Sequence, residues 1–205
     1  MIAIIDYDAG NIKSVEKALA LFGEEIVISR DKKVILEAEK VILPGVGSFG
    51  DAMGKIRFYG LEDVIKEVVR RGTPFLGICL GLQLLFESSE ESIGVKGLGI
   101  LKGHIVRIPE QDGLKVPHMG WNSLRFMNHG VLFSGLKEDT FVYFVHSYYL
   151  KAEDPSIVTA TTEYSTLIHA AVEYKNVYAC QFHPEKSSEV GLAILKNFIQ
   201  LGRNS

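Results

Sequence analysis

Cysteine is scarce in this sequence. Only Cys79 and Cys180 occur among the 205 residues, and two thiols in a chain of this length do not make a disulfide framework. Long apolar runs are also missing, because no stretch approaches the roughly 20 apolar residues that a membrane span needs. Residues 1–6 carry no basic region, and their apolar run is too short for a signal peptide. We therefore expect a cytoplasmic protein with reduced thiols and no membrane partner.

The sequence also has little net charge. The formal net charge is −3, and the densest acidic stretch, residues 87–91, is interrupted by two serines. These features give no indication of a nucleic-acid partner. No Cys-x-x-Cys, His-x-His or His-Glu-x-x-His spacing occurs in the sequence, so we expect no metal ion and no other cofactor.

The overall composition is that of a soluble globular protein, with 47% hydrophobic and 23% charged residues. A chain of this length can bury a well-formed core within one domain. The sequence contains no internal repeat, linker or low-complexity segment. We therefore predict a single domain that spans residues 1–205.

Strand and helix patterns alternate in the first half of the chain. Short apolar runs predict strands over residues 2–6, 25–29, 41–43 and 74–78, and helical periodicity predicts helices over residues 12–22, 49–57, 61–71 and 80–86. This alternation favours a parallel sheet with helices on both faces. Ligands bind beyond the carboxyl ends of such strands, where the sequence places Cys79 and the turn of Gly45, Val46 and Gly47.

The second half of the chain is richer in strand signals. These predict strands over residues 100–108, 115–121, 141–146, 157–162, 168–173 and 177–182. A last helix follows over residues 190–199, and either Ser187 or Ser188 can cap it. The predicted fold is therefore α/β, with a mostly parallel sheet and an additional antiparallel portion.

Cys79 is the candidate nucleophile. It stands in a Gly-x-Cys-x-Gly pattern, Gly77 to Gly81, between a predicted strand and a predicted helix, which is the arrangement of a nucleophile elbow. The elbow exposes the side chain near a helix N-terminus, where the positive end of the helix dipole favours a thiolate. The alternative is a buried core cysteine, the commoner fate of a lone thiol. The flanking glycines favour the catalytic interpretation for Cys79, whereas Cys180 lacks them and is predicted to lie in the core.

His183 and Glu185 are the candidate base and its orienting carboxylate. A thiolate nucleophile needs a base that later protonates the leaving amine. His183-Pro184-Glu185 follows a predicted strand, and residues two apart in extended geometry point the same way. The carboxylate can then fix the tautomer and orientation of the imidazole.

Gly45, Val46 and Gly47 form a candidate oxyanion turn after the third strand. Backbone amides in a glycine-rich turn can approach a ligand closely, and acyl transfer needs donors directed at the developing oxyanion. The alternatives are a plain turn or a phosphate-binding loop, although no Gly-Lys-Ser/Thr follows, as a P-loop requires.

Together these motifs resemble the class I, or triad, glutamine amidotransferases over essentially the whole chain. Two motifs carry the resemblance: residues 77–83 (Gly-Ile-Cys-Leu-Gly-Leu-Gln) and residues 181–185 (Gln-Phe-His-Pro-Glu). Further patterns are similar to one branch of that family, the glutaminase subunits of imidazole glycerol phosphate synthase in histidine biosynthesis. They are Asp6-Tyr7-x-x-Gly10-Asn11 and residues 44–50, 117–122 and 143–148. The resemblance implies a flavodoxin-like sheet and a single amidotransferase domain.

The resemblance also implies a reaction. Cys79 would attack the glutamine side-chain amide, His183 would move the proton, and Glu185 would orient His183, so that ammonia and then glutamate are released through a glutamyl thioester. It places Gly45, Val46, Gly47, Gln83, Glu91, Ser147 and Tyr148 around the bound glutamine and the oxyanion. Polar side chains of this kind suit a ligand with an ammonium and a carboxylate group.

The resemblance further implies a partner, because this chain is too short to contain a synthase domain that uses the ammonia. That partner is the (β/α)₈-barrel cyclase subunit, which converts PRFAR to imidazole glycerol phosphate and AICAR as part of a heterodimer. The family pattern places Pro117, His118, Met119, Trp121, Asn122 and Tyr143 near the interface. A cluster of aromatic and methionine side chains suits an interface anchor, although Trp121 could equally pack in the core.

Two other functions use the same residues differently. A stand-alone cysteine hydrolase or peptidase on a similar α/β fold would share the nucleophile but need no partner. A non-catalytic binding module would keep the fold without using the triad, and the intact Cys-His-Glu set argues against it.

Overall fold

The computed structural model describes residues 1–128 and 130–202, and its strands belong to one 12-stranded mixed sheet. The first half of the chain contains β1 (Ile2–Ile5), α1 (Ile12–Ala20), β2 (Ile26–Ser29), α2 (Lys32–Glu37), β3 (Lys40–Leu43), α3 (Phe49–Phe58), α4 (Glu62–Arg70), β4 (Phe75–Ile78) and α5 (Leu80–Leu84). The second half contains β5 (Ser88–Ser89), β6 (Gly103–Arg107), β7 (His118–Phe126), β8 (Thr140–His146), β9 (Tyr148–Ala152), β10 (Val158–Tyr164), β11 (Thr166–Tyr174), β12 (Val177–Cys180) and α6 (Ser188–Gln200).

The parallel part of the sheet has the strand order β2-β1-β3-β4-β12, as in flavodoxin-like folds. Parallel strands need crossover connections, and α1 to α4 supply them in the first half of the chain. All five strands end at the same edge of the sheet. The residues that follow β3, β4 and β12 therefore lie side by side, and these are the oxyanion turn, Cys79 and the segment that leads to His183.

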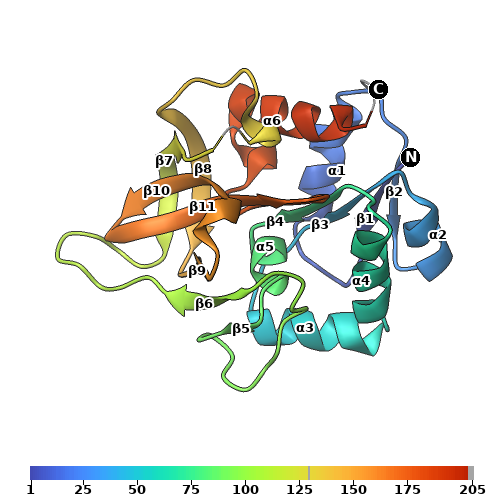
Figure 1. The fold of residues 1–205 in the computed structure, drawn as a ribbon, viewed down its shortest axis with the longest axis horizontal. Coiled ribbons are helices and arrows are strands. Elements are labelled where there is room, and N and C mark those ends of the chain that lie inside the picture. The colour runs from blue at the N-terminus through green and yellow to red at the C-terminus, as the bar shows by residue number, and fades with distance from the viewer. Residues whose placement is uncertain (129, 203–205) are drawn as a thin grey trace.

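Helices cover both faces of the parallel part because alternate strand residues point to opposite sides. On one face, Ala3, Ile5 and Leu43 pack with apolar residues of α3, α4 and α5. On the other, Ile4, Ile42 and others pack with α1 and α6. Figure 1 shows α1 and α6 together on one side of the sheet and α3 to α5 on the other. Strands that are buried on both faces explain the continuous apolar runs in the sequence.

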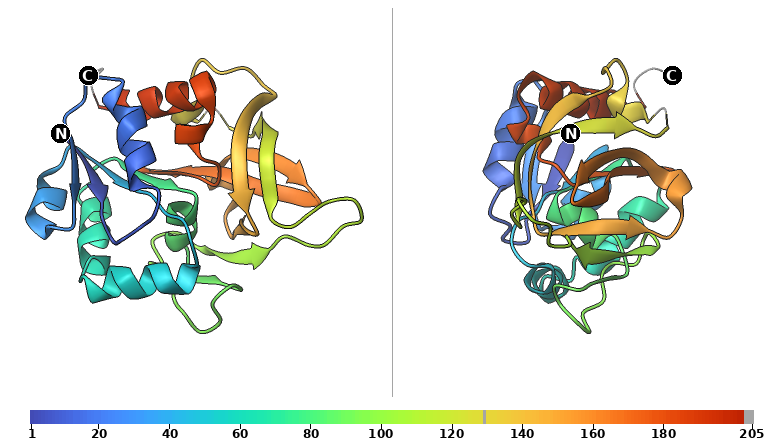
Figure 2. Two further views of the ribbon diagram at one scale, coloured as in Figure 1. Left: turned by 180° about the vertical axis from the view of Figure 1, so that it is seen from behind. Right: turned by 90° about the vertical axis from the view of Figure 1, so that its left-hand side faces the viewer.

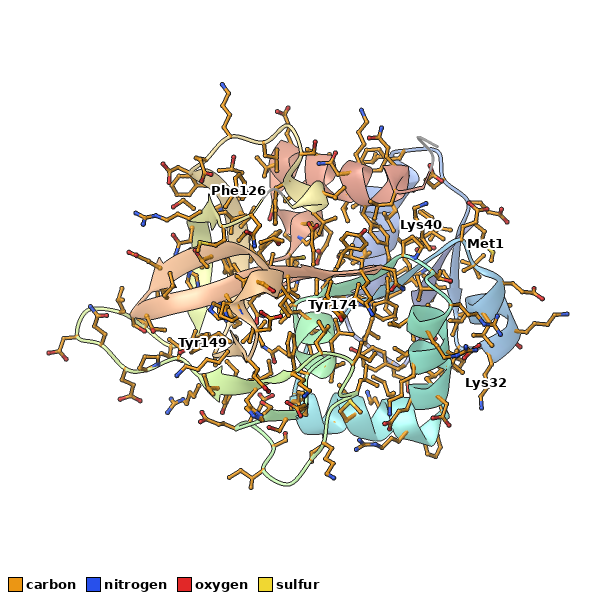
Figure 3. The ribbon with its side chains drawn as sticks, in the orientation of Figure 1. Met1, Lys32, Lys40, Phe126, Tyr149 and Tyr174 are labelled. Carbon is orange, nitrogen blue, oxygen red and sulfur yellow. The ribbon has the colours of Figure 1, made fainter. Side chains whose placement is uncertain are left out.

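Antiparallel strands extend the sheet beyond β12 in the order β11-β10-β7-β8. A second ribbon, in which β6 pairs with β9, joins the sheet where β9 meets β11. Figure 2 shows these strands gathered at the end of the molecule away from β2. In Figure 3, Phe126 and Tyr149 mark this end, and Met1 and Lys32 mark the parallel end. The predicted α/β class with an antiparallel addition is therefore confirmed.

Several predicted elements were wrong in detail. The predicted strand over residues 115–121 begins and ends later, as β7, and the strand over residues 100–108 is shorter, as β6. Among the strands and α-helices, three were not predicted: the two-residue strand β5, strand β9 and the six-residue helix α2. Asp31 caps α2 by accepting from the amides of Lys33 and Val34. Ser187 precedes α6 but does not cap it, because its hydroxyl donates to His183 O and accepts from Tyr143 N instead.

None of the helices formed by residues 1–128 and 130–202 combines the length and apolar character needed to cross a bilayer.

Candidate active site

Cys79 sits in a strained turn between β4 and α5. Its backbone has φ 55° and ψ −108°, a conformation that L residues avoid unless the surrounding structure imposes it. The two flanking glycines are required by space. A Cβ atom on Gly81 would lie 1.9 Å from Leu43 O, and one on Gly77 would lie 2.8 Å from Gly81 O. The sequence pattern therefore produces the nucleophile elbow that was predicted from it.

His183 and Glu185 lie behind the thiol, after β12. Glu185 Oε1 is 2.8 Å from His183 Nδ1, and both side chains are buried. The expected extended backbone is absent, because residues Pro184–Lys186 form a 3₁₀ turn. The two side chains still meet, because the turn brings the carboxylate of Glu185 to Nδ1 of the His183 ring. The carboxylate holds the Nδ1–H tautomer, which leaves Nε2 available for proton transfer.

The charge on His183 depends on its two neighbours. Burial disfavours the charged ring, but the Cys79 sulfur and the Glu185 carboxylate outweigh burial and raise the pKa of His183 to about 10. His183 Nε2 has no acceptor at hydrogen-bonding geometry among the described residues. The interaction with Cys79 is therefore electrostatic in this arrangement. At neutral pH these contacts favour the protonated, imidazolium form of His183.

Asn11 joins this cluster, a role that its sequence pattern did not predict. It occupies the N-cap position of α1 but makes no capping bond with its side chain. Its amide instead donates to Glu185 Oε1 and lies 3.5 Å from His183 Nδ1. A residue type that normally caps a helix is here used to hold the carboxylate. The Gly10-Asn11 pair after β1 was the available signal.

We expect Glu185→Gln to lower glutamine turnover by roughly 10²–10⁴-fold and to change its pH dependence. The new amide side chain at position 185 keeps an oxygen that can accept from Asn11 and His183. It lacks the negative charge that helps raise the pKa of His183. The imidazolium then loses its proton at a lower pH, so the alkaline limb of the kcat/KM profile moves to lower pH. Glu189→Gln, a charge removal at an exposed position in the first turn of α6, is the control. An alkaline limb that stays in place in Glu185→Gln would contradict this role.

A cavity of about 330 Å³ opens in front of the thiol and the imidazole. Six of the seven residues predicted around glutamine line it: Val46, Gly47, Gln83, Glu91, Ser147 and Tyr148. Gly45 does not, because it is buried beneath the turn against Tyr7 and Leu80. Leu80, Pro117, Val145 and His146 complete the wall. Its volume suits a single amino acid, and its lining mixes carboxylate, amide and hydroxyl groups.

The candidate oxyanion turn, Gly45 to Gly47, is bonded to the start of α5. Gly47 has φ 98°, which glycine tolerates. The carbonyl of Gly45 accepts a 3.4 Å hydrogen bond from the Leu80 amide. In nucleophile elbows the amide after the nucleophile is an oxyanion donor, so this donor is engaged within the protein.

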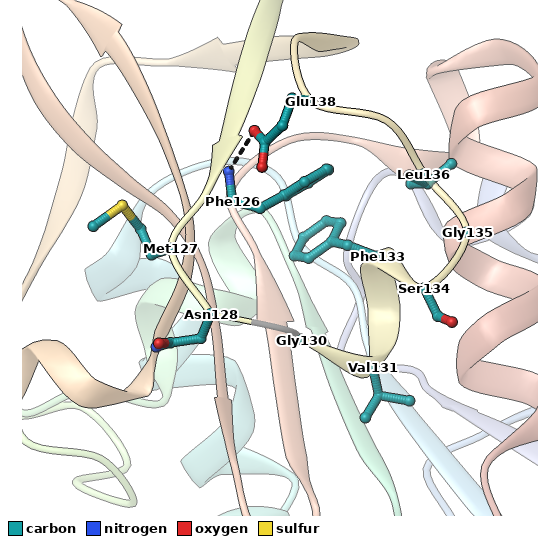
Figure 4. Close-up of a pocket in the computed structure, with 10 residues that line it drawn as sticks. All are labelled: Phe126, Met127, Asn128, Gly130, Val131, Phe133, Ser134, Gly135, Leu136 and Glu138. Carbon is teal, nitrogen blue, oxygen red and sulfur yellow. Dashed lines mark hydrogen bonds between the residues drawn. The ribbon is translucent and has the colours of Figure 1, made fainter.

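A larger cavity, about 710 Å³, is lined by the end of β7 and the segment that connects β7 to β8. Figure 4 shows the rings of Phe126 and Phe133 side by side in its lining, with Glu138 accepting from the Phe126 amide. Its described lining residues include no cysteine, histidine or lysine. We therefore assign the candidate active site to the smaller cavity, because the reactive side chains of Cys79 and His183 line that one.

The six predicted interface residues differ in how much of their surface is exposed. Met119 and Trp121 are 62% and 51% exposed on β7, and Trp121 meets Tyr143 of β8 edge-on. Pro117 is exposed at the mouth of the cavity, and Asn122 is half-buried. His118, in contrast, is only 3% exposed, because it stacks between Phe144 and Tyr164. The apolar stacking removes its ring from the surface of this chain, and its place near the partner interface stays a prediction.

In the part of the chain that the structure describes, no three His, Cys, Asp or Glu side chains are grouped to hold a metal ion. The site's chemistry is carried by sulfur, imidazole, carboxylate and amide groups.

Comparisons with known proteins agree on one family. Residues 3–201 match the family described as Glutamine amidotransferase class-I. The chain is 50% identical to "Imidazole glycerol phosphate synthase subunit HisH" of Moorella thermoacetica over 204 residues, covering 100% of this chain and 96% of that protein. It is also 50% identical to the subunit of the same name from Aquifex aeolicus, over 95% of this chain and 94% of that protein.

The fold is shared with more distant solved structures. One, described as a glutamine amidotransferase, superposes with a TM-score of 0.76 at 21% identity and covers 98% of both chains. At that identity the likeness concerns the fold, an α/β sheet flanked by helices.

Proposed function

Because this chain belongs to the class-I glutamine amidotransferases, and within them to the branch of the HisH subunits, we propose that Cys79, His183 and Glu185 hydrolyse glutamine to glutamate and ammonia. The observation that carries the proposal is the arrangement at the carboxyl edge of the sheet. A thiol on a strained elbow and an imidazole bonded to a buried carboxylate border one amino-acid-sized cavity.

In the first half of the proposed reaction, Cys79 reacts as a thiolate beside the imidazolium form of His183. The sulfur of Cys79 attacks the side-chain amide carbon of glutamine, and the carbonyl electron pair moves onto oxygen. As the tetrahedral intermediate collapses, His183 gives its proton to the nitrogen. Ammonia leaves, and a glutamyl thioester remains on Cys79.

The second half restores the pair. Neutral His183 takes a proton from water while the hydroxide oxygen attacks the thioester carbon. The carbon–sulfur bond breaks, glutamate is released, and Cys79 and His183 return to thiolate and imidazolium. Glu185 stabilises the imidazolium in both halves. A nucleophilic thiol suits a reducing compartment, so the proposed place of action is the cytoplasm.

Substrate contacts are proposed from the lining of the cavity. Glu91, Ser147 and the free carbonyl oxygen of Gln83 supply acceptors for the glutamine ammonium group, and backbone amides of the turn at Val46 and Gly47 supply donors. The Gln83 amide nitrogen is already used by Tyr148 O and Gln181 Oε1, so its contribution to the substrate is an acceptor.

The proposed partner is a (β/α)₈-barrel cyclase, which uses the ammonia to convert PRFAR to imidazole glycerol phosphate and AICAR. Met119, Trp121 and Phe141 expose apolar surface on the paired strands β7 and β8, next to Pro117 at the cavity mouth. Aromatic and methionine side chains of this kind are enriched at interface anchors. Docking on this face would place the cyclase beside the mouth of the cavity that Cys79 lines.

We expect glutaminase activity to be low in the isolated chain and to rise when the cyclase and its ribulotide are present. The reason is the Leu80 amide, which is engaged by the Gly45 carbonyl. Freeing it for the oxyanion requires the turn to move, and loss of one such donor costs roughly 10²–10³-fold in kcat. Glutamate release measured with the chain alone, with cyclase, and with cyclase plus ribulotide tests this directly.

Two results would contradict the proposal. Equal turnover in all three mixtures would contradict control of the oxyanion turn by the partner. Full peptidase activity of the chain alone, without a glutaminase response to the cyclase, would favour a stand-alone cysteine hydrolase.

A further inference from the structure

The Cys79 sulfur has one side-chain hydrogen-bond donor that the mechanism above does not use. Gln181 Nε2 lies 3.6 Å from Cys79 Sγ. Gln181 follows β12 and is fully buried, with 0% of its surface exposed. A buried amide can face a sulfur with either its carbonyl or its NH₂ group, and only the NH₂ group stabilises a thiolate.

The surrounding contacts select the NH₂ group. The carbonyl of Tyr148, which can only accept, lies 3.0 Å from Gln83 Nε2, so Gln83 must turn its NH₂ group toward it. The other hydrogen of that NH₂ group bonds to Gln181 Oε1 at 3.0 Å. With its oxygen used in this way, Gln181 can present only N–H to Cys79. A single backbone carbonyl thereby fixes the orientation of two side-chain amides.

The side chain of His146 also bonds to the carbonyl oxygen of Tyr148. His146 Nδ1 lies 2.9 Å from Tyr148 O, and His146 Nε2 lies 3.0 Å from His118 Nδ1. Burial lowers the pKa of His146 to about 3 and that of His118 to about 4. Both rings are therefore neutral at pH 7, and each acts as one donor and one acceptor. Asn122 Nδ2 is 3.4 Å from His118 Nε2 and completes this row of bonds.

We propose that Gln181 is a further catalytic residue, whose Nε2–H donates to the Cys79 thiolate in an orientation fixed by Tyr148 O through Gln83. Its part in glutamine hydrolysis rests on the function proposed above. Gln181 is then needed before substrate arrives, because it stabilises the nucleophile in the free enzyme. Gln83 has two tasks: it positions Gln181 with its nitrogen and keeps its oxygen for the substrate.

The test is the pH dependence of Cys79 alkylation by iodoacetamide, followed by mass spectrometry on the full chain. Gln181→Glu replaces the donor with an acceptor of the same shape, and Gln181→Met removes the donor without adding charge. We expect the half-maximal alkylation rate at a higher pH in both variants, and about tenfold slower alkylation at pH 7 from loss of one charge-assisted bond. With the cyclase present, glutamine kcat/KM should fall by a similar factor.

The matched control is Asn197→Asp. Asn197 also donates its amide hydrogens to backbone carbonyls, those of Leu132 and Ser134, and none of these three residues lines the cavity of Cys79. It should alter stability without moving the alkylation profile. Folded Gln181 variants that alkylate with the wild-type pH dependence would overturn the proposal and leave Gln181 as a core residue.

If neither Gln181 variant folds, a measurement on the wild-type protein tests the contact between Gln181 and Cys79. The side-chain amide signal of Gln181 in ¹⁵N-labelled protein should shift with the same pH midpoint as Cys79 alkylation. An amide signal that stays constant through that midpoint would overturn the proposal. Neither alkylation nor the amide signal requires glutamine. Both can therefore support the contact between Gln181 and the thiolate even if the protein does not hydrolyse glutamine. Absence of glutamine hydrolysis would count against the proposed function alone.

Discussion

Cys79→Ala should abolish glutamine-dependent synthesis by the complex with the cyclase, with a loss of at least about 10⁴-fold in kcat. The substitution removes the sulfur that would carry the glutamyl group, and no neighbouring side chain in the cavity offers a comparable nucleophile. Ammonia-dependent synthesis by the same complex should survive, because it bypasses the thiol. Product formation with glutamine or with ammonium salt as nitrogen donor measures both quantities.

Cys180→Ala is the matched control. Burial raises the pKa of Cys180 well above its ordinary value, so this thiol stays protonated, and it contacts only the core and Phe182 O. Its removal should leave glutamine-dependent synthesis intact at a small cost in stability. Glutamine-dependent turnover that persisted in Cys79→Ala would mean that another group is the nucleophile.

Gly81→Ala should destabilise the protein severely. The added Cβ would lie 1.9 Å from Leu43 O, a backbone atom of the central strand β3 that cannot move without disturbing the sheet. Overpacking of this kind costs about 3 kcal/mol or more, which corresponds to a fall of at least about 6 °C in the melting temperature for a chain of this size. Thermal unfolding followed by circular dichroism measures the change.

Gly54→Ala provides the contrast within the same protein. Gly54 lies inside α3, and a Cβ there meets nothing within 4 Å. Because alanine is the better helix former, this substitution should stabilise the protein by up to about 1 kcal/mol. A Gly81→Ala variant as stable as Gly54→Ala would show that the elbow does not need its second glycine for lack of space.

The sequence was sufficient for the elbow and for the order of the main elements. Gly77 and Gly81 flank Cys79 because neither position has space for a Cβ atom. A requirement of this kind leaves a pattern that a single sequence shows. Buried strands also leave a clear signal in continuous apolar runs, as β1, β3 and β4 do. The meeting of His183 with Glu185 was predicted correctly, but through the wrong backbone geometry, because a 3₁₀ turn and an extended segment can both bring residues two apart together.

The contacts made across long sequence separations could not be predicted. Asn11 reaches Glu185, and Gln181 reaches both Gln83 and Cys79, and each pair is brought together by strand order rather than by local pattern. His118 was expected near the partner interface because the family pattern places it there, whereas stacking by Phe144 and Tyr164 buries its ring in this chain. Strand β9 was missed because it directly follows β8, with one residue between them.

The most direct test is to expose the complex to a glutamine analogue that carries an electrophilic carbon in place of the amide, and to locate the modification by mass spectrometry. Attack at that carbon requires the sulfur, the imidazole and the amino-acid pocket to converge. The predicted result is one adduct on Cys79, formed faster with the cyclase and prevented by excess glutamine. An unmodified Cys79, or an adduct on another residue, would contradict the central claim that this thiol is the glutamine nucleophile.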